Sequence, residues 1–393
     1  MPYFPLPPHF QSFFQGGFEC AYPIDEHHVR MDLLADTKHD LYCRSDYELM
    51  RSLGIETVRE GLSWSQIDKG HAVYDFSRFE KMMKIGKVTH TEQIWDLNHF
   101  DYPEYIDFFS DEFPQAFASY AQQAIKTLRT YSEKTLYIVP QNEISFFSFI
   151  GGDHGVWAPH QKNRGVEMKK QLVKATLLAM KAIWDVDTDV RFIHVDPIFY
   201  RTPKDLSSPE QRAVADAFIE AKFQAWDMIS GAVFPELGGD PEYLDILGAN
   251  YYYYNQEWIV DAHNPADIRY ETIPLNSQKR ISIRAFLQEI HDRYRRPIVI
   301  TETGGWGDLR KKWWGRILPE CLVALDKGSP LYGICSYPII DRPDWTDGHL
   351  TNSGFYDFIA NDPVRQRYPH QETISVVQPY IVKMNSLFKK DAE

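Results

Sequence analysis

Eight short apolar segments recur along the chain, and amphipathic or irregular stretches separate them. Several of these segments are almost continuous in apolar and β-branched residues, which is typical of parallel strands covered on both faces. Strands that alternate with helices predict a parallel sheet, and eight of them predict an α/β fold with a (β/α)8 barrel, the TIM barrel. The expected strands are 15–21, 56–62, 91–97, 135–141, 190–196, 244–250, 297–303 and 332–338.

The stretches between the expected strands contain helical patterns. Residues 46–54 place Tyr47, Met50 and Leu53 on one face and stop at Gly54, a common signal for the end of a helix. An open, doubly wound sheet is the alternative architecture, but no GxGxxG motif follows the first expected strand. The other expected helices are 113–131, 166–186 and 281–296.

The length of 393 residues suits one α/β barrel with insertions. No Gly/Ser-rich linker, low-complexity segment or long run of charge divides the chain. We therefore expect a single barrel domain over 1–393, with an N-terminal extension at 1–14 and a C-terminal tail at 380–393.

The net charge of −13 would repel phosphate backbones and anionic membrane surfaces, so we expect no nucleic-acid or membrane partner. No segment approaches the roughly 18 apolar residues that span a bilayer. The first residues, MPYFPLPPHFQSFFQGG, lack the basic and apolar regions of a signal peptide. These features predict a cytoplasmic protein, and they leave its oligomeric state open.

The sequence gives no sign of a metal site or an organic cofactor. His27 and His28 adjoin Asp25 and Glu26, but adjacent residues rarely bind one ion together, and a solvated loop is the simpler interpretation. The cysteines are scattered without CxxC spacing, which predicts reduced thiols rather than a disulfide framework or a zinc site. They are Cys20, Cys43, Cys321 and Cys335.

Two of the expected strands end in a glutamate. The fourth leads into Asn142 and Glu143, and the seventh ends at Glu302, with Trp306 just beyond. Functional residues of such barrels gather where strands end, although a salt bridge at the barrel mouth could explain either glutamate alone. Two opposed carboxylates suit the hydrolysis of an acetal, and retaining enzymes hold them about 5–5.5 Å apart. The aromatic content of 15% fits either a rich core or a cleft that stacks on sugar rings.

Six motifs follow one another along the expected barrel: VREGLSWSQI (58–67), LNHFDYPE (97–104), QNEI (141–144), GANYYY (248–253), ITETGG (300–305) and DRPDW (341–345). On these motifs the chain resembles the clan A glycoside hydrolases, and most closely the family 1 β-glycosidases, over nearly its whole length. This resemblance implies a retaining β-glycosidase that hydrolyses a small β-linked glycoside or oligosaccharide through a covalent glycosyl-enzyme. In that mechanism Glu302 is the nucleophile and Glu143 the acid/base.

The resemblance also implies roles for residues around the two glutamates. Arg59 would lie beside Glu302 and favour its ionised form, and Tyr252 would donate a hydrogen bond to the same carboxylate. Asn142 would bind the 2-hydroxyl of the substrate, and His99 would donate to another sugar hydroxyl. Structural hydrogen bonding is the alternative for Arg59, His99 or Tyr252 taken singly.

The chain departs from the family pattern where the family contacts the sugar in the −1 subsite, whose anomeric carbon reacts. Pro23 stands near the usual glutamine, with Glu19 close enough in sequence to substitute for it. Tyr337 replaces a tryptophan beneath the sugar, and Asp344 replaces a longer glutamate. DRPDWTDG also lacks the phosphate-binding loop of 6-phospho-glycosidases. The remaining candidate substrate-binding residues are Trp306 and Trp345.

Two other functions suit the same sequence. A transglycosylase would use the same site and pass the sugar to an acceptor instead of water. A non-catalytic carbohydrate-binding barrel would need one of the two glutamates to be absent or misplaced. The sequence leaves the sugar, the linkage and the aglycone open.

Overall fold

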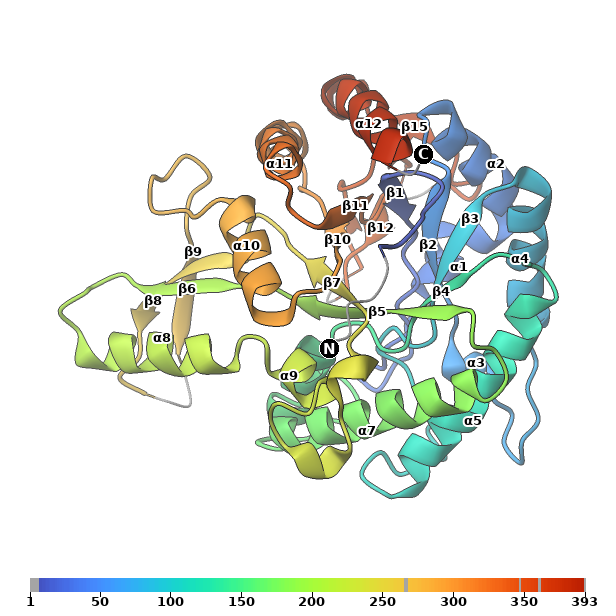
Figure 1. Cartoon of the computed structure of the whole chain (residues 1–393), viewed down its shortest axis with the longest axis horizontal. Coiled ribbons are helices and arrows are strands. Elements are labelled where there is room, and N and C mark those ends of the chain that lie inside the picture. The colour runs from blue at the N-terminus through green and yellow to red at the C-terminus, as the bar shows by residue number, and fades with distance from the viewer. Residues whose placement is uncertain (1–6, 265–267, 346–347, 360–361, 392–393) are drawn as a thin grey trace.

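Eight parallel strands close into a barrel at the centre of the computed structural model, as the strand pattern predicts (Figure 1). The structure describes residues 7–264, 268–345, 348–359 and 362–391. Each expected segment overlaps one barrel strand, and β11 pairs with β1 to close the ring. The barrel strands are β1 (Phe14–Gly17), β2 (Thr57–Gly61), β3 (Glu92–Asp96), β4 (Leu136–Val139), β5 (Val190–Pro197), β7 (Ile246–Asn250), β10 (Ile298–Thr303) and β11 (Leu331–Ser336).

Helices surround the barrel, and all four predicted helices are present (Figure 1). These are α2 (His39–Ser52), α5 (Glu112–Arg129), α7 (Gly165–Trp184) and α10 (Ile283–Tyr294). The other helices are α1 (Leu33–Thr37), α3 (Trp64–Ile67), α4 (Ser77–Thr89), α6 (Ile144–Phe147), α8 (Pro209–Ala221), α9 (Gln224–Ile229), α11 (Leu309–Asp326) and α12 (Gln371–Asp391), with a π-helical turn η1 at Ser148–Asp153.

Helix α2 begins well before the predicted residue because its first turns bury polar side chains. His39 Nδ1 lies 2.8 Å from Asp46 Oδ2, and its Nε2 lies 2.9 Å from Glu60 Oε1 on β2. Burial opposes the positive charge, but Glu60 and Asp46 raise the pKa of His39 well above its ordinary value. This buried ionic cluster joins α2 to the barrel. Because its members are polar, the apolar periodicity of the sequence does not indicate this first part of the helix.

An apolar cluster fills the inside of the barrel toward the N-terminal ends of its strands. Phe10, from the expected N-terminal extension, closes this cluster with its ring 4.4 Å from that of Tyr137. The backbone N–H of His9 donates to the Tyr137 hydroxyl at 2.8 Å. The buried members are Phe10, Ile94, Tyr137, Val139, Ile193, Val195, Ile246 and Val299. This packing leaves only the C-terminal ends of the strands for a polar site.

Residues 380–391, expected as a C-terminal tail, instead form the second half of α12. This helix packs against α11 and reaches β1, with Ile381 and Met384 buried. Asn385 accepts a hydrogen bond from the backbone of Phe14 at 3.0 Å and donates to the carbonyl of Gly54 at 2.7 Å. β1 begins at Phe14, the last residue of the expected extension, while residues 1–6 and 392–393 lie outside the described ranges.

A second, three-stranded sheet lies outside the barrel and was not predicted. It consists of β6 (Tyr200–Pro203), β8 (Gln256–Asp261) and β9 (Arg269–Thr272), and it projects with α8 from one side of the molecule (Figure 1). These strands are short and half-exposed, so their apolar pattern is weak. After β11 the chain forms two short hairpin pairs, β12 (Arg342–Pro343) with β13 (Leu350–Thr351) and β14 (Tyr356–Asp357) with β15 (Tyr368–Pro369).

All four cysteines are buried free thiols, as expected. Within the described ranges, every helix is too short or too polar to cross a membrane.

We expect Ile381→Ala to lower the free energy of unfolding by about 2–5 kcal/mol, because it opens a cavity beneath α12. Val382→Ala, one residue further along the same helix, should change stability by less than about 0.5 kcal/mol, since Val382 is 61% exposed. Urea unfolding of the two variants measures the difference. Equal, small effects would show that the second half of α12 does not contribute to the folded core.

Candidate active site

A cavity of about 1310 Å³ opens at the C-terminal ends of the barrel strands. Its walls come from the loops after β4, β7, β10 and β11. Seven residues that were predicted from the sequence line it: Glu143, Tyr252, Glu302, Trp306, Tyr337, Asp344 and Trp345. The other four, Glu19, Arg59, His99 and Asn142, lie buried beneath these lining residues and contact one or more of them or each other.

Glu302 lies near the end of β10 and is held at both carboxylate oxygens. Arg59 Nη1 donates to Oε1 at 2.7 Å, and the Tyr252 hydroxyl donates to Oε2 at 2.7 Å. Burial and the charge of Glu302 raise the pKa of Tyr252, so this hydroxyl stays protonated and can donate. The arrangement fixes the orientation of Glu302 and compensates its negative charge.

Arg59, on β2, connects the polar groups at the bottom of the cavity. Its side chain is 1% exposed, and Nε and Nη2 donate to the two oxygens of Asp96 at 2.9 and 2.6 Å. Nη2 also donates to Asn142 Oδ1 at 2.8 Å. Burial disfavours the charged guanidinium, but Asp96 and Glu302 raise the pKa of Arg59 well above its usual value. The Arg59 guanidinium is thus the cationic centre of a buried group of charged and polar side chains.

Asp96 was not predicted as a site residue, although it too lies at the end of a barrel strand, as the two glutamates do. Burial raises its pKa, but the Arg59 guanidinium and the His99 hydrogen bond outweigh burial and lower the pKa below the ordinary value. Asp96 therefore carries a permanent negative charge beneath the cavity. A lone aspartate at a strand end gives no sign of this role until its arginine partner is known.

Glu143 lies in a strained turn between β4 and α6. Its φ of 44° and ψ of 61° are in the left-handed region, which is uncommon for a residue other than glycine. The turn is held by hydrogen bonds from Glu143 N to Val195 O at 3.1 Å and from Asn142 N to Asn98 O at 2.9 Å. This conformation aims the Glu143 side chain into the cavity.

The environment of Glu143 favours its protonated form. Its Oε1 accepts a hydrogen bond from Asn250 Nδ2 at 2.9 Å. Burial is the main cause that raises the pKa of Glu143 well above its usual value, and the negative charges of Glu302 and Asp196 add to it. The cavity thus contains one compensated carboxylate and one that holds its proton to higher pH.

His99 and Asn142, both expected to bind sugar hydroxyls, contact each other beneath the cavity. His99 Nδ1 lies 2.9 Å from Asp96 Oδ2, and its Nε2 lies 3.0 Å from Asn142 Nδ2. Their roles toward a substrate stay predictions.

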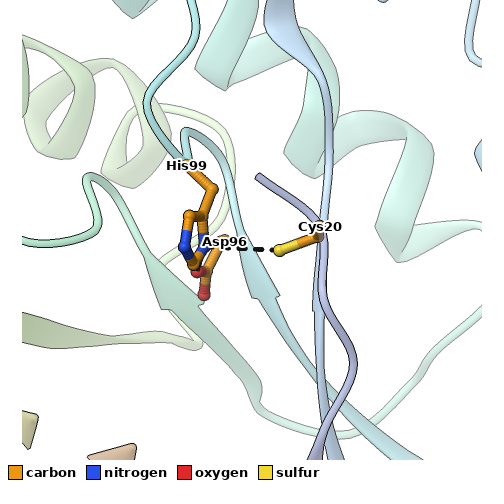
Figure 2. A group of neighbouring side chains, drawn as sticks. All are labelled: Cys20, Asp96 and His99. Atoms are coloured by element: carbon orange, nitrogen blue, oxygen red, sulfur yellow. Dashed lines mark hydrogen bonds and ion pairs between the residues drawn. The ribbon is translucent and has the colours of Figure 1, made fainter. Parts of the chain in front are cut away.

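Cys20, Asp96 and His99 form a buried group whose spacing could suit a metal ion (Figure 2). Cys20 Sγ lies 3.3 Å from His99 Nδ1, as the dashed line in Figure 2 shows. However, Arg59 already binds both oxygens of Asp96, and its charge would repel a second cation. Burial also raises the pKa of the Cys20 thiol, whereas a metal needs the thiolate. These residues therefore fit a metal ion poorly.

Aromatic rings form two walls of the cavity. On one wall Trp306 stacks on Tyr254, with ring centroids 5.0 Å apart and planes 9° apart, and on Tyr252 at 5.6 Å. On the other wall Phe146 lies 6.3 Å from Trp345. Such surfaces suit the apolar face of a sugar or an aglycone ring.

Tyr337 forms the floor between these walls. Its ring stacks on that of His99, with 5.8 Å between centroids, and its hydroxyl donates to Glu19 Oε1 at 3.1 Å. A Cβ atom at Gly17 would lie 2.3 Å from the Tyr337 ring. Position 17 therefore has to be glycine as long as the Tyr337 ring occupies this space.

The chain matches the model of Glycosyl hydrolase family 1 over residues 21–235, more than half of its length. It is 25% identical, over 397 aligned positions, to the aryl-phospho-beta-D-glucosidase BglC of Bacillus subtilis (strain 168), with 79% of each protein covered. The family 1 β-glucosidase of Thermotoga maritima has the same fold, with a TM-score of 0.77 and 16% identity, and 97% of this chain and 99% of that chain are covered. Its complex with isofagomine lactam gives a TM-score of 0.77 and covers 96% of this chain. The predicted barrel and the predicted resemblance are confirmed.

We expect Asp196→Asn to lower the pKa of Glu143. Burial raises the pKa of Asp196 to about 6, so above that pH its negative charge opposes ionisation of Glu143. Asparagine can still accept the hydrogen bond that Ser145 N donates to Asp196 Oδ1 at 2.8 Å. NMR titration of protein carrying 13C at the glutamate carboxyl carbons measures the change. Asp216→Asn, at an exposed position on α8, serves as the control, and an equal response in both variants would contradict the assigned cause.

Proposed function

The chain belongs to glycosyl hydrolase family 1 and is a glycoside hydrolase of the retaining class, and from that premise we propose that Glu302 is its nucleophile and Glu143 its acid/base. The main support is the contrast between two carboxylates in one cavity. Glu302 is held by Arg59 and Tyr252 at 2.7 Å each, while burial and charge repulsion raise the pKa of Glu143. We further propose that the whole chain acts as one catalytic unit built on the barrel.

In the first step an oxygen of Glu302 attacks the anomeric carbon of a β-glycoside. The bond from this carbon to the leaving oxygen breaks, and Glu143 gives its proton to that oxygen. Arg59 and Tyr252 hold the attacking carboxylate in a fixed orientation, because each donates a hydrogen bond to it. The product of this step is a covalent ester between the sugar and Glu302.

In the second step a water molecule attacks the same carbon, and Glu143 accepts a proton from it. The bond from this carbon to the Glu302 oxygen breaks, which releases the sugar and restores the Glu302 carboxylate. Formation of the ester removes the negative charge of Glu302, one of the causes that raise the pKa of Glu143. The pKa of Glu143 therefore falls after the first step, and the group that acted as an acid becomes a base. The sugar leaves with the configuration it had in the substrate.

The aromatic walls favour a substrate with flat apolar faces, either a sugar in a β-linked oligosaccharide or an aryl aglycone. The Bacillus relative is named as an aryl-phospho-β-D-glucosidase, but DRPDWTDG in this chain carries three aspartates against the single cation of Arg342, a balance that disfavours a phosphate. We therefore propose a β-glycoside without phosphate. Product analysis with an added acceptor sugar distinguishes hydrolysis from transglycosylation at this site. Because both carboxylates line the cavity, a binding-only role has no support.

We expect Glu302→Ala to lower kcat with an aryl β-glycoside by about 10⁴-fold or more. Sodium azide should restore part of the turnover, because the missing carboxylate leaves room for an anion next to the anomeric carbon. Attack from that side gives the α-glycosyl azide, which NMR identifies. Glu92→Ala, which removes a buried carboxylate at the other end of the barrel, should show no azide rescue. A β-glycosyl azide from Glu302→Ala would contradict the assignment of the nucleophile.

For Glu143→Ala we expect a loss that depends on the leaving group. A 2,4-dinitrophenolate needs no proton, so its glycoside should still form the glycosyl-enzyme, while an alkyl glycoside should not. Rapid-quench measurement of the released phenolate tests this. If both substrates lose the first step to the same extent, the acid role of Glu143 is wrong.

A further inference from the structure

Arg342, on β12, is a charged residue in the cavity wall. Its side chain is 6% exposed, yet it lines the same cavity as Glu302 and Tyr337. Its Nε lies 3.0 Å from Glu19 Oε2, and its guanidinium lies 4.4 Å from the centre of the Trp345 ring.

The Arg342 guanidinium has unused hydrogen-bonding capacity. It carries five N–H groups, and the only acceptor among residues in the described ranges is the carbonyl of Pro343, 2.7 Å from Nη1. Glu19 Oε2 lies behind the wall and holds Arg342 by an ion pair at 3.0 Å, without accepting a hydrogen bond itself. Buried donors and acceptors are nearly always paired. Arg342 therefore presents guanidinium N–H groups at the cavity wall that can donate to a ligand.

This pair is rigid before any ligand binds. Glu19 Oε1 accepts from the Tyr337 hydroxyl and from the backbone N–H groups of Cys20 and Ala21, each at 3.1 Å. The ring of Trp345 fixes the plane of the guanidinium. Little side-chain entropy is then lost on binding, which favours selective recognition.

The pair lies at the far end of the Tyr337 side chain from the nucleophile. The Tyr337 ring is 5.4 Å from the Arg59 guanidinium, which binds Glu302, while its hydroxyl contacts Glu19. One aromatic ring is about as long as one pyranose ring. A sugar above Tyr337, with its anomeric carbon at Glu302, would thus present its opposite end to Arg342 and Glu19.

We propose that Arg342, held in place by Glu19, determines which sugar the −1 subsite accepts, by binding neutral hydroxyls at the end of the ring remote from the cleaved bond. This inference rests on the proposed function. A sugar hydroxyl can accept from the guanidinium N–H groups that face the cavity, while Glu19 holds Arg342 from behind. A phosphate or carboxylate would gain Arg342 but meet Glu19, with Asp344 in the same cavity wall, so a neutral sugar is favoured.

The test combines variants of Arg342 with changes in the substrate. Wild type and Arg342→Gln are compared on the best 4-nitrophenyl β-glycoside of a sugar panel and on its 4-deoxy, 6-deoxy and 6-phosphorylated forms. We expect Arg342→Gln to lower kcat/KM for the parent glycoside about 10- to 100-fold, as for a lost hydrogen bond to a charged group. For at least one deoxy form the loss should shrink below about 3-fold, since that substrate lacks the contact already.

Two further variants separate recognition from folding. Arg342→Lys keeps the charge beside Glu19 but loses the planar fork, so it should fold like wild type and retain part of the selectivity. Lys312→Gln, which removes an exposed cation of α11 near the mouth of the cavity, should change kcat/KM less than 2-fold. If Arg342→Gln does not fold, the comparison of deoxy substrates is made with Arg342→Lys.

Equal losses on the parent and on all deoxy forms would overturn the inference and leave Arg342 a structural role. A wild-type preference for the 6-phosphorylated glycoside that Arg342→Gln abolishes would overturn it in favour of an anion site. Failure of the wild type to cleave any glycoside of the panel would contradict the proposed function, and this inference with it.

Discussion

The buried guanidinium of Arg59 organises the polar end of the barrel. It donates hydrogen bonds to Asp96, to Glu302 and to the amide oxygen of Asn142, three groups from three different strands or strand ends. Loss of one partner from such a buried ionic group costs about 3–5 kcal/mol, because a charge remains without compensation. Lysine cannot replace it, since a single ammonium lacks the planar fork that reaches two carboxylates at once. The apolar cluster below excludes water and makes each of these contacts stronger.

The same closed barrel produces two glutamates with opposite properties. Glu302 faces the cation and a phenol, whereas Glu143 faces an amide and two negative charges. The difference is created by the positions of Arg59 and Asp196 around the ring rather than by the glutamates themselves. The left-handed backbone of Glu143 is part of this design, because a relaxed turn would send the side chain elsewhere.

Much of the fold follows from local sequence, and much of the site does not. The barrel strands are predictable because each is a dense apolar run, and Glu143 and Glu302 stand out at the ends of two of them. The polar face of α2 and the role of Asp96 are not visible, since each depends on partners far away in the sequence. The contacts of His99 have the same origin, because its ring lies between Asp96 and Asn142. Arg342 lies within a recognised motif, yet its significance appears only when Glu19 and Trp345 are beside it in space.

The close contact between Gly17 and Tyr337 ties the first strand of the barrel to the last. Gly17 ends β1, Tyr337 directly follows β11, and the ring occupies the volume that a side chain at position 17 would need. Any residue larger than glycine at 17 therefore requires this ring to move, and the aromatic floor beneath the substrate would move with it.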